Sequence, residues 1–279
     1  MNEIFDLLKI SISYDSRKKQ IEQYMNQNKS HKLLKLTIGS TNLNFKKTEF
    51  IISPLGMEED NGWCPKDGIV LFGYEPIDLK GDGEDDNQQI SVYDFSFPVD
   101  NENSINLNEF PSFAIYFDTK YGEYYIKDFN IGIGALMKIK KYKFEKNILI
   151  NIGANYLVIS VEDDDLVVKI FNSNILEKNS DEKKFDSKSF KITKDKNFQI
   201  TIGRSKSCDI SIEDMMMSKI QSSIKYNPKD GGFYLYDGNS EKESMNGTWV
   251  YILNPVKITD NFIFKAEHTL FVLNLIHNK

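Results

Sequence analysis

The sequence predicts an all-β protein with two tandem β-sandwiches behind a short N-terminal helical extension. Short apolar runs rich in Ile, Val, Phe and Tyr alternate with clusters of Asn, Asp and Gly, which is typical of sandwich strands and their turns. The length of 279 residues allows two domains of ordinary size. A hydrophobic content of 40%, with 13% aromatic residues, is sufficient for packed cores.

Residues 1–44 are expected to form the extension. Residues 16–25 predict a short helix that is too polar on most faces to belong to a core. We interpret this helix as a solvated lead-in to the first domain. A docking segment for a partner is the alternative interpretation.

Residues 45–162 predict the first sandwich. Its candidate strands are 67–73, 113–117, 124–128, 148–153 and 156–161. The polar residues 81–89 predict a solvated loop. The acidic run from Glu162 to Asp165 is the expected junction with the second domain.

Residues 163–279 predict the second sandwich, whose first strand is expected at 166–171. The polar residues 178–188 are expected to form a solvated loop between the first two strands of this domain.

Arginine is rare in this chain, because Arg17 and Arg204 are the only arginines among 35 basic residues. Arg204 follows an apolar run that ends at Gly203. Ser218 and Lys219 come next, and then the run 244–248. The planar guanidinium matches a phosphate with two parallel hydrogen bonds, which an ammonium group cannot do. The pattern therefore predicts a phosphate-binding site built from loops.

This ordered set resembles the forkhead-associated (FHA) domain, a β-sandwich that binds phosphothreonine peptides. The resemblance rests on Gly203-Arg204, a strand at 209–214, Ser218-Lys219, Asp237 and the run Ser-Met-Asn-Gly-Thr at 244–248. Each piece alone is weak, since Asn-Gly marks any tight turn. The order and spacing together are specific, and the resemblance covers residues 163–279.

The resemblance implies that Arg204 holds the phosphate oxygens, Ser218 donates a hydroxyl hydrogen bond, and Lys219 adds a mobile charge. Asn246 would bond the backbone of the phosphopeptide. Six residues would support these loops: Gly203, Ser205, Gln221, Asp237, Gly247 and Thr248. In the alternative, structural interpretation, the glycines serve the turns, Ser218 caps a turn and Lys219 is one more surface lysine.

Two features depart from the family pattern. Gln221 stands where the family has a histidine that braces the binding loops, and we expect glutamine to copy its hydrogen bonds only in part. Residues 238–243 form a longer loop than usual, and its acids are expected to weaken phosphate binding.

The first domain resembles a degenerate FHA domain. Phe72-Gly73-Tyr74 corresponds to Ile202-Gly203-Arg204, and the stretch 93–96 is matched with Glu213-Asp214. Asp128 corresponds to Asp237, and Ile133 stands in the place of Asn246. A tyrosine cannot supply a bidentate cationic contact and an isoleucine cannot hydrogen-bond a peptide. We therefore expect a retained fold without a phosphate site.

Other functions are not supported by the sequence. The net charge of −6 lies entirely in residues 1–162 and no basic stripe is present, which argues against nucleic-acid binding. No apolar run is long enough to span a membrane. Gly132–Gly134 lacks a dinucleotide fingerprint, residues 81–86 lack calcium-loop spacing, and the three histidines are scattered. We expect no cofactor, no metal and no enzymatic activity.

The favoured function is a non-enzymatic adaptor that binds phosphothreonine-containing proteins. The alternative is a structural component of a large intracellular assembly, held among neighbouring subunits and using FHA folds as scaffolds. The Asn- and Lys-rich texture is similar to that of tandem FHA chains from ciliated protists, which suggests the cytoskeleton and the ciliary axoneme. With no signal peptide evident and only two cysteines, the expected location is intracellular, cytoplasmic or cytoskeletal, with the nucleus as the alternative.

Overall fold

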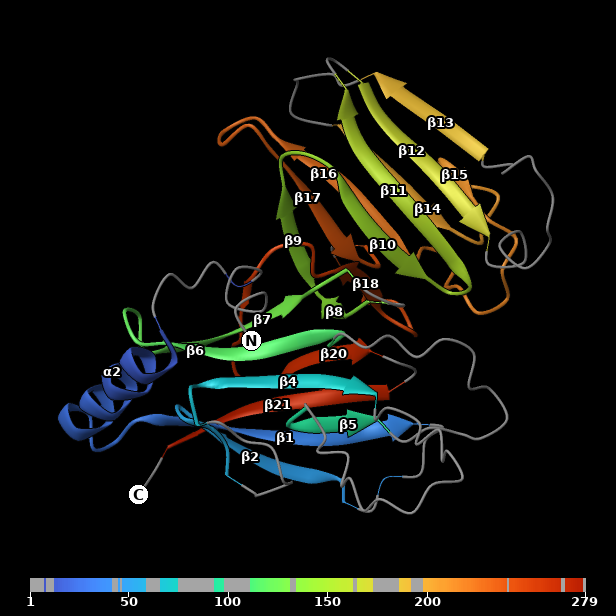
Figure 1. The fold of residues 1–279 in the computed structure, drawn as a ribbon. Coiled ribbons are helices and arrows are strands. Elements are labelled where there is room, and N and C mark those ends of the chain that lie inside the picture. Colours follow the sequence, from blue (N-terminus) through green and yellow to red (C-terminus); the bar gives the residue numbers. More distant parts are fainter. Residues whose placement is uncertain are drawn as a thin grey trace, which may run out of the picture. The chain divides into compact units, whose positions relative to one another are not determined.

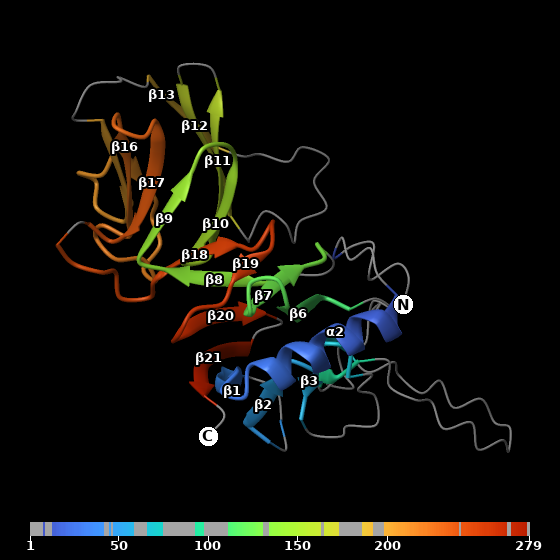
Figure 2. The ribbon, with the colours of Figure 1, turned by 90° about the vertical axis from the view of Figure 1, so that its left-hand side faces the viewer.

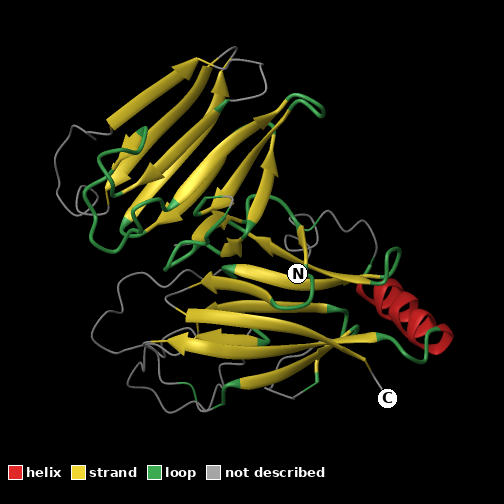
Figure 3. Cartoon of the chain, turned by 180° about the vertical axis from the view of Figure 1, so that it is seen from behind, coloured by secondary structure: helices red, strands yellow, loops and turns green. Residues whose placement is uncertain are grey.

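The computed structural model describes residues 8, 13–41, 45, 47–58, 66–74, 93–97, 111–130, 134–162, 165–172, 186–191, 198–239, 241–266 and 269–277. In this part of the chain strands dominate and one helix is present (Figure 3). The predicted all-β fold class is confirmed. The chain divides into two compact units: unit 1 comprises Met1–Ala135 and Ile252–Lys279, and unit 2 comprises Leu136–Tyr251.

Unit 1 is built from both ends of the chain, so blue and red strands lie together in Figure 1. Its strands are β1 (Lys32–Thr41), β2 (Glu49–Ser53), β3 (Gly56–Met57), β4 (Ile69–Tyr74), β5 (Phe95–Phe97), β6 (Phe113–Asp118), β7 (Glu123–Asp128), β19 (Val256–Lys257), β20 (Phe262–Ala266) and β21 (Thr269–His277). One layer has the order β20-β21-β1-β2-β3 and the other β19-β7-β6-β4-β5. Aromatic rings join the layers: Phe72 lies 6.4 Å from Phe271, and Phe113 lies 5.5 Å from Phe264.

The helix α2 (Tyr14–Gln27) packs against the strands of unit 1, to which it belongs (Figure 2). The buried Arg17 donates from Nε to the carbonyl oxygen of Asp67 and from Nη2 to that of Phe117, both at 2.7 Å. Ile21 is fully buried, and the ring of Tyr24 lies 5.1 Å from that of Phe117. The interpretation of this helix as a solvated lead-in was therefore wrong, because two side chains on one face are enough to anchor it.

The extension predicted to run to residue 44 is also shorter than expected. Strand β1 pairs along its length with β21 and over residues 34–37 with β2, and Leu34, Leu36 and Ile38 are buried. Residues 32–41 thus belong to the sandwich, as their alternation of apolar and polar side chains requires.

Unit 2 is a second sandwich, formed by one continuous segment. Its strands are β8 (Leu136–Ile139), β9 (Lys141–Phe144), β10 (Ile148–Ile152), β11 (Asn155–Glu162), β12 (Asp165–Asn172), β13 (Asp186–Lys191), β14 (Gln199–Gly203), β15 (Ile210–Ser211), β16 (Ser222–Asn227), β17 (Gly232–Asp237) and β18 (Thr248–Tyr251). One layer has the order β13-β12-β11-β10-β18-β8 and the other β15-β14-β16-β17-β9.

Two predicted segments of this region differ in extent from the structure. The strand expected at 209–214 is limited to Ile210–Ser211. Of the loop expected at 178–188, residues 186–188 belong to β13, and residues 178–185 lie outside the described residues. The loop at 81–89 lies outside the described residues.

The two units share one strand order. The layer β19-β7-β6-β4-β5 of unit 1 matches β9-β17-β16-β14-β15 of unit 2, and β20-β21-β1-β2 matches β10-β11-β12-β13. In each unit one strand pair is parallel and has a glycine at the equivalent position. Gly73 of β4 lies opposite Ser96 of β5, and Gly203 of β14 lies opposite Ser211 of β15. The sequence therefore contains two repeats of one sandwich.

The repeats exchange their last strands. Strands β9–β11 end the first repeat in the chain but complete unit 2, whereas β19–β21 end the second repeat and complete unit 1. Accordingly, the junction expected after Glu162 falls between β11 and β12, which pair from Asn155–Asn172 to Glu162–Asp165 in one sheet. The ranges 45–162 and 163–279 thus approximate the repeats, but they are not the compact units. Sequence alone cannot reveal the exchange, because both sets of last strands have similar apolar alternation.

Candidate functional site

Three loops of unit 2 carry the predicted site residues. The first loop (204–209) follows β14, the second (212–221) precedes β16, and the third (238–247, described except for residue 240) connects β17 and β18. The amides of Arg204 and Ser205 donate to the carbonyl oxygens of Ser218 and Lys219, each at 3.1 Å. A Cβ at Gly203 would overlap with the carbonyl oxygen of Lys219, so a glycine is needed where the first two loops meet.

Gln221 joins the second and third loops. Its side chain is fully buried, and Oε1 accepts a hydrogen bond from the amide of Ser218 at 2.9 Å. Nε2 donates to the hydroxyl of Ser244 and to the carbonyl oxygen of Gly247, both at 2.8 Å. These bonds engage the carbonyl and both amide protons of the glutamine. Gln221 therefore braces both loops, more fully than the sequence led us to expect.

A buried acid organises the third loop. Asp237 is 2% exposed, and its Oδ1 accepts from the hydroxyls of Ser244 at 2.6 Å and Thr248 at 2.8 Å. The hydroxyl oxygen of Ser244 also accepts from the amide of Gly247, whose φ of +77° favours glycine. Thr248 is fully buried, so Asp237 and Thr248 shape the loop and are not accessible to a ligand.

The four predicted ligand-binding residues lie at the surface of these loops. Arg204, Lys219 and Asn246 are exposed, and Ser218 is half-buried. The hydroxyl of Ser218 accepts from the amide of Met245 at 2.9 Å, which leaves its proton to be donated elsewhere. Nδ2 of Asn246 donates to the carbonyl oxygen of Met216 at 2.6 Å, which ties the third loop to the second.

The chemistry of this surface suits an anion. Two cationic side chains, a hydroxyl donor and an amide stand on loops that main-chain and side-chain hydrogen bonds hold together. The acid Glu243 of the third loop forms an ion pair with Lys140 at 3.0 Å. Because both partners are solvent-exposed, this pair only weakly offsets the charge of the acid.

Ser205 and Asp209 support the first loop. The hydroxyls of Ser205 and Ser207 lie 2.8 Å apart, and Asp209 Oδ2 accepts from the amide and the hydroxyl of Thr201, both at 2.8 Å. Sequence reasoning missed the loop-closing role of Asp209 and the central place of Ser244. Both residues stand inside the quoted motifs, so the signal was present without its geometry.

Unit 1 repeats the supporting contacts. The amide of Leu71 donates to Asp94 Oδ2 at 2.8 Å, as Thr201 does to Asp209. The amide of Ser112 donates to the carbonyl oxygen of Phe72 at 2.8 Å, which is the counterpart of the 2.7 Å bond from Gln221 to Ile202. Asp94 is thus the counterpart of Asp209. The match of residues 93–96 with Glu213-Asp214 was therefore wrong.

The positions that would contact a ligand differ in unit 1. Tyr74 follows Gly73 where Arg204 follows Gly203, and its ring lies 5.4 Å from that of Phe97. Asp128 occupies the register position of Asp237, opposite Phe113 as Asp237 is opposite Ser222. Ile133 lies outside the described residues.

Comparison with known families identifies the second repeat. Residues 200–266, from β14 to the end of β20, match the family model of the FHA domain. The chain contains an FHA domain. The match includes all three loops of the site, and FHA domains are protein-interaction modules that bind phosphothreonine-containing proteins. No curated protein and no solved structure matches the chain.

The match also crosses the boundary between the units. Residues 200–251 of the FHA match lie in unit 2, whereas 252–266 lie in unit 1. One contiguous family segment is thus divided between two sandwiches, as the exchange of the last strands requires.

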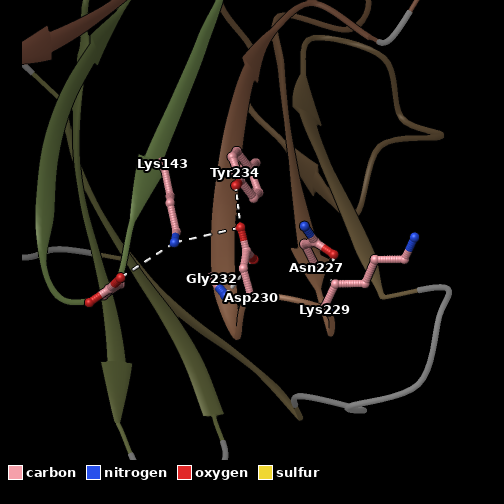
Figure 4. Close-up of polar contacts among 7 residues, drawn as sticks. Lys143, Asn227, Lys229, Asp230, Gly232 and Tyr234 are labelled. Atoms are coloured by element: carbon pink, nitrogen blue, oxygen red, sulfur yellow. Dashed lines mark hydrogen bonds and ion pairs between the residues drawn. The ribbon is translucent and has the colours of Figure 1, made fainter.

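A polar cluster at the opposite end of β17 offers a contrast to the site. Figure 4 shows Asp230, before β17, accepting from the hydroxyl of Tyr234 at 2.5 Å and lying 3.6 Å from Nζ of Lys143. The hydrogen bond from Tyr234 is the main cause that lowers the pKa of Asp230, and desolvation opposes it. The charges of Asp230 and Lys143 are thus compensated within this cluster.

The described residues contain no group of His, Cys, Asp and Glu that could hold a metal ion. Within the same residues, no helix has the length and apolar character needed to cross a membrane.

Proposed function

We propose that the protein is a non-enzymatic adaptor whose unit 2 binds phosphothreonine peptides through Arg204, Ser218, Lys219 and Asn246. The observation that carries the proposal is that the three loops contain two separate groups of polar residues, one buried and one exposed. The bracing groups Gln221, Asp237 and Thr248 are buried and hydrogen-bonded to one another or to the loops, whereas the cations are exposed.

Arg204 is the central contact in this proposal. Within the described part of the chain its guanidinium has no hydrogen-bond or ion-pair partner, whereas the guanidinium of Arg17 donates to two main-chain carbonyl oxygens. A planar guanidinium can hold two phosphate oxygens at once. The Ser218 proton and the Lys219 ammonium would complete the shell around the phosphate. Asn246 retains its carbonyl oxygen and one amide proton for the peptide backbone.

The test is a binding assay with the full-length chain and a degenerate phosphothreonine peptide library, beside the unphosphorylated library. Arg204→Ala removes the proposed contact, and Lys229→Ala removes an exposed lysine from the turn before β17, at the opposite end from the site. We expect phosphate-dependent binding that is weakened at least about 30-fold by Arg204→Ala and unchanged by Lys229→Ala. Equal binding by Arg204→Ala and wild type would overturn the proposal.

A second candidate function comes from unit 1. Its loops keep the supporting glycine and acids, but Tyr74 replaces the arginine and packs beside Phe97. We propose unit 1 as a degenerate FHA domain that serves as a scaffold. In the corresponding alternative for the whole protein, both units are structural parts of an intracellular assembly, cytoskeletal or axonemal. Absence of phosphate-dependent binding in the library assay would favour this alternative.

A further inference from the structure

Exposed methionines lie on two of the loops that carry the proposed phosphate site. Five large apolar side chains are exposed among the described residues: Tyr121, Met215, Met216, Met245 and Leu253. The three methionines are 94%, 63% and 88% exposed and belong to the second and third loops. We call Met215, Met216 and Met245 the methionine patch. Exposed apolar side chains on neighbouring loops mark interaction sites more often than isolated ones do.

The patch is continuous with the site through its backbone. The amide of Met245 donates to the hydroxyl of Ser218 at 2.9 Å, and the carbonyl oxygen of Met216 accepts from Asn246 at 2.6 Å. Each bond joins a methionine of the patch to a proposed ligand-binding residue. A peptide bound at Ser218 and Asn246 would therefore lie close to Met245 and Met216.

The loop that carries two of these methionines is anchored. Asp214 Oδ2 accepts from the amide of Ala154 and from Asn155 Nδ2, both at 2.9 Å, while Oδ1 accepts from the amide of Met216 at 2.8 Å. The side chain of Met217 is 2% exposed and packs in the core under this loop. Met215 and Met216 are thus exposed on a loop that hydrogen bonds hold in place, whereas the side chain of Met217 is buried.

Resting on the proposed function, we infer that the methionine patch selects phosphothreonine segments that carry an apolar side chain beside the phosphothreonine. Methionine is unbranched and polarizable, so it adapts to apolar partners of different shape. Burying apolar surface on both partners is favourable and adds to the contact with the phosphate. The patch therefore contributes sequence preference, whereas Arg204 contributes the phosphate requirement.

The experiment uses the full-length chain and phosphothreonine peptides taken from the library, each with one flanking position changed to Leu, Ala, Lys or Glu. The matched variant replaces Met215, Met216 and Met245 by Gln, which keeps the side-chain length and removes the apolar character. A second variant replaces the same three residues by Leu. Because the three side chains are exposed and the hydrogen bonds use main-chain atoms, both variants should fold.

We expect at least one flanking position at which Leu binds about tenfold more tightly than Ala, a difference of about 1.4 kcal/mol. The Gln variant should lose this preference while keeping the affinity for the Ala peptide, and the Leu variant should retain it. Arg204-dependent binding without an apolar preference, or with a preference for Lys or Glu that the Gln variant keeps, would overturn the inference alone. No phosphate-dependent binding by the wild type would overturn the proposed function, and the inference with it.

Discussion

Units 1 and 2 share one strand order and differ in the residues that their equivalent loops expose. Both keep a glycine near the end of β4 or β14, an acid that accepts from that strand, and an aspartate at the end of the following hairpin. These residues are Gly73, Asp94 and Asp128 in unit 1, and Gly203, Asp209 and Asp237 in unit 2. Tyr74 and Arg204, which follow the glycines, are chemically unrelated. The shared residues therefore serve the sandwich, and the residues that differ are candidates for ligand binding.

The two arginines also differ in that one has a structural role and the other is a candidate for ligand binding. Arg17 is 7% exposed and donates to two main-chain carbonyl oxygens. Its guanidinium group therefore stabilises the contact of α2 with the strands of unit 1. Arg204 is exposed. Scarcity of arginine in a lysine-rich chain thus indicates sites where a planar fork is needed, but it does not say whether the need is structural or functional.

The largest effect should come from removing residues 252–279. This deletion takes β19–β21 from unit 1 and leaves unit 2 complete, so unit 1 should unfold while the 136–251 segment keeps its fold. We expect the isolated segment 136–251 to give a cooperative thermal transition and to bind the phosphothreonine peptide like the full-length chain. An unfolded 136–251 segment would show that the strands are not exchanged.

Arg17→Ala should destabilise unit 1 by about 3 kcal/mol, because two hydrogen bonds from a charged donor are lost and two buried carbonyl oxygens lose their partner. Denaturant unfolding monitored by circular dichroism measures this effect. Peptide affinity of the variant should stay at the wild-type value, since Arg17 belongs to the other unit. A change in stability below about 0.5 kcal/mol would contradict the anchoring role of Arg17.

Gln221→Ala should destabilise unit 2 by about 2 kcal/mol and weaken phosphothreonine binding about tenfold, because the second and third loops lose their common brace. Calorimetric titration and thermal unfolding of the same samples check both values. The counterpart Ser112→Ala in unit 1 is the control, and it should leave binding unchanged. Wild-type affinity in Gln221→Ala would show that the loops do not need this brace.

The smallest effect concerns a half-buried lysine of unit 1. Desolvation lowers the pKa of Lys265 to about 8 from 10.5, whereas its register counterpart in unit 2 is the neutral Asn151. The folded state binds fewer protons between these two values, so the penalty is full below pH 8 and disappears as the pH rises to 10.5. Lys265→Met should raise the free energy of unfolding by about 1 kcal/mol at pH 7, with the gain shrinking above pH 8. A gain that does not change with pH would contradict this explanation.

The strands and the site residues could be predicted from the sequence because both depend on patterns of residues that are close together in the chain. Alternation predicted β4, β6, β7 and β10–β12, and the motif order predicted the loops that contain Arg204, Ser218 and Asn246. The anchoring of α2 was missed, since its buried contacts come mainly from Arg17 and Ile21 on an otherwise polar helix. The strand exchange was missed because the acidic run at 162–165 was interpreted as a domain junction, whereas Glu162 and Asp165 pair with each other where β11 and β12 form one antiparallel ladder.

The most direct test of phosphate binding by unit 2 is calorimetric titration of the full-length Arg204→Tyr variant with the best phosphothreonine peptide. This substitution gives unit 2 the residue that unit 1 has at the equivalent position. We predict that phosphate-dependent binding is lost while the thermal transition of the protein is unchanged. Binding within about twofold of the wild-type affinity, a difference of about 0.4 kcal/mol, would contradict the assignment of Arg204 as the phosphate contact.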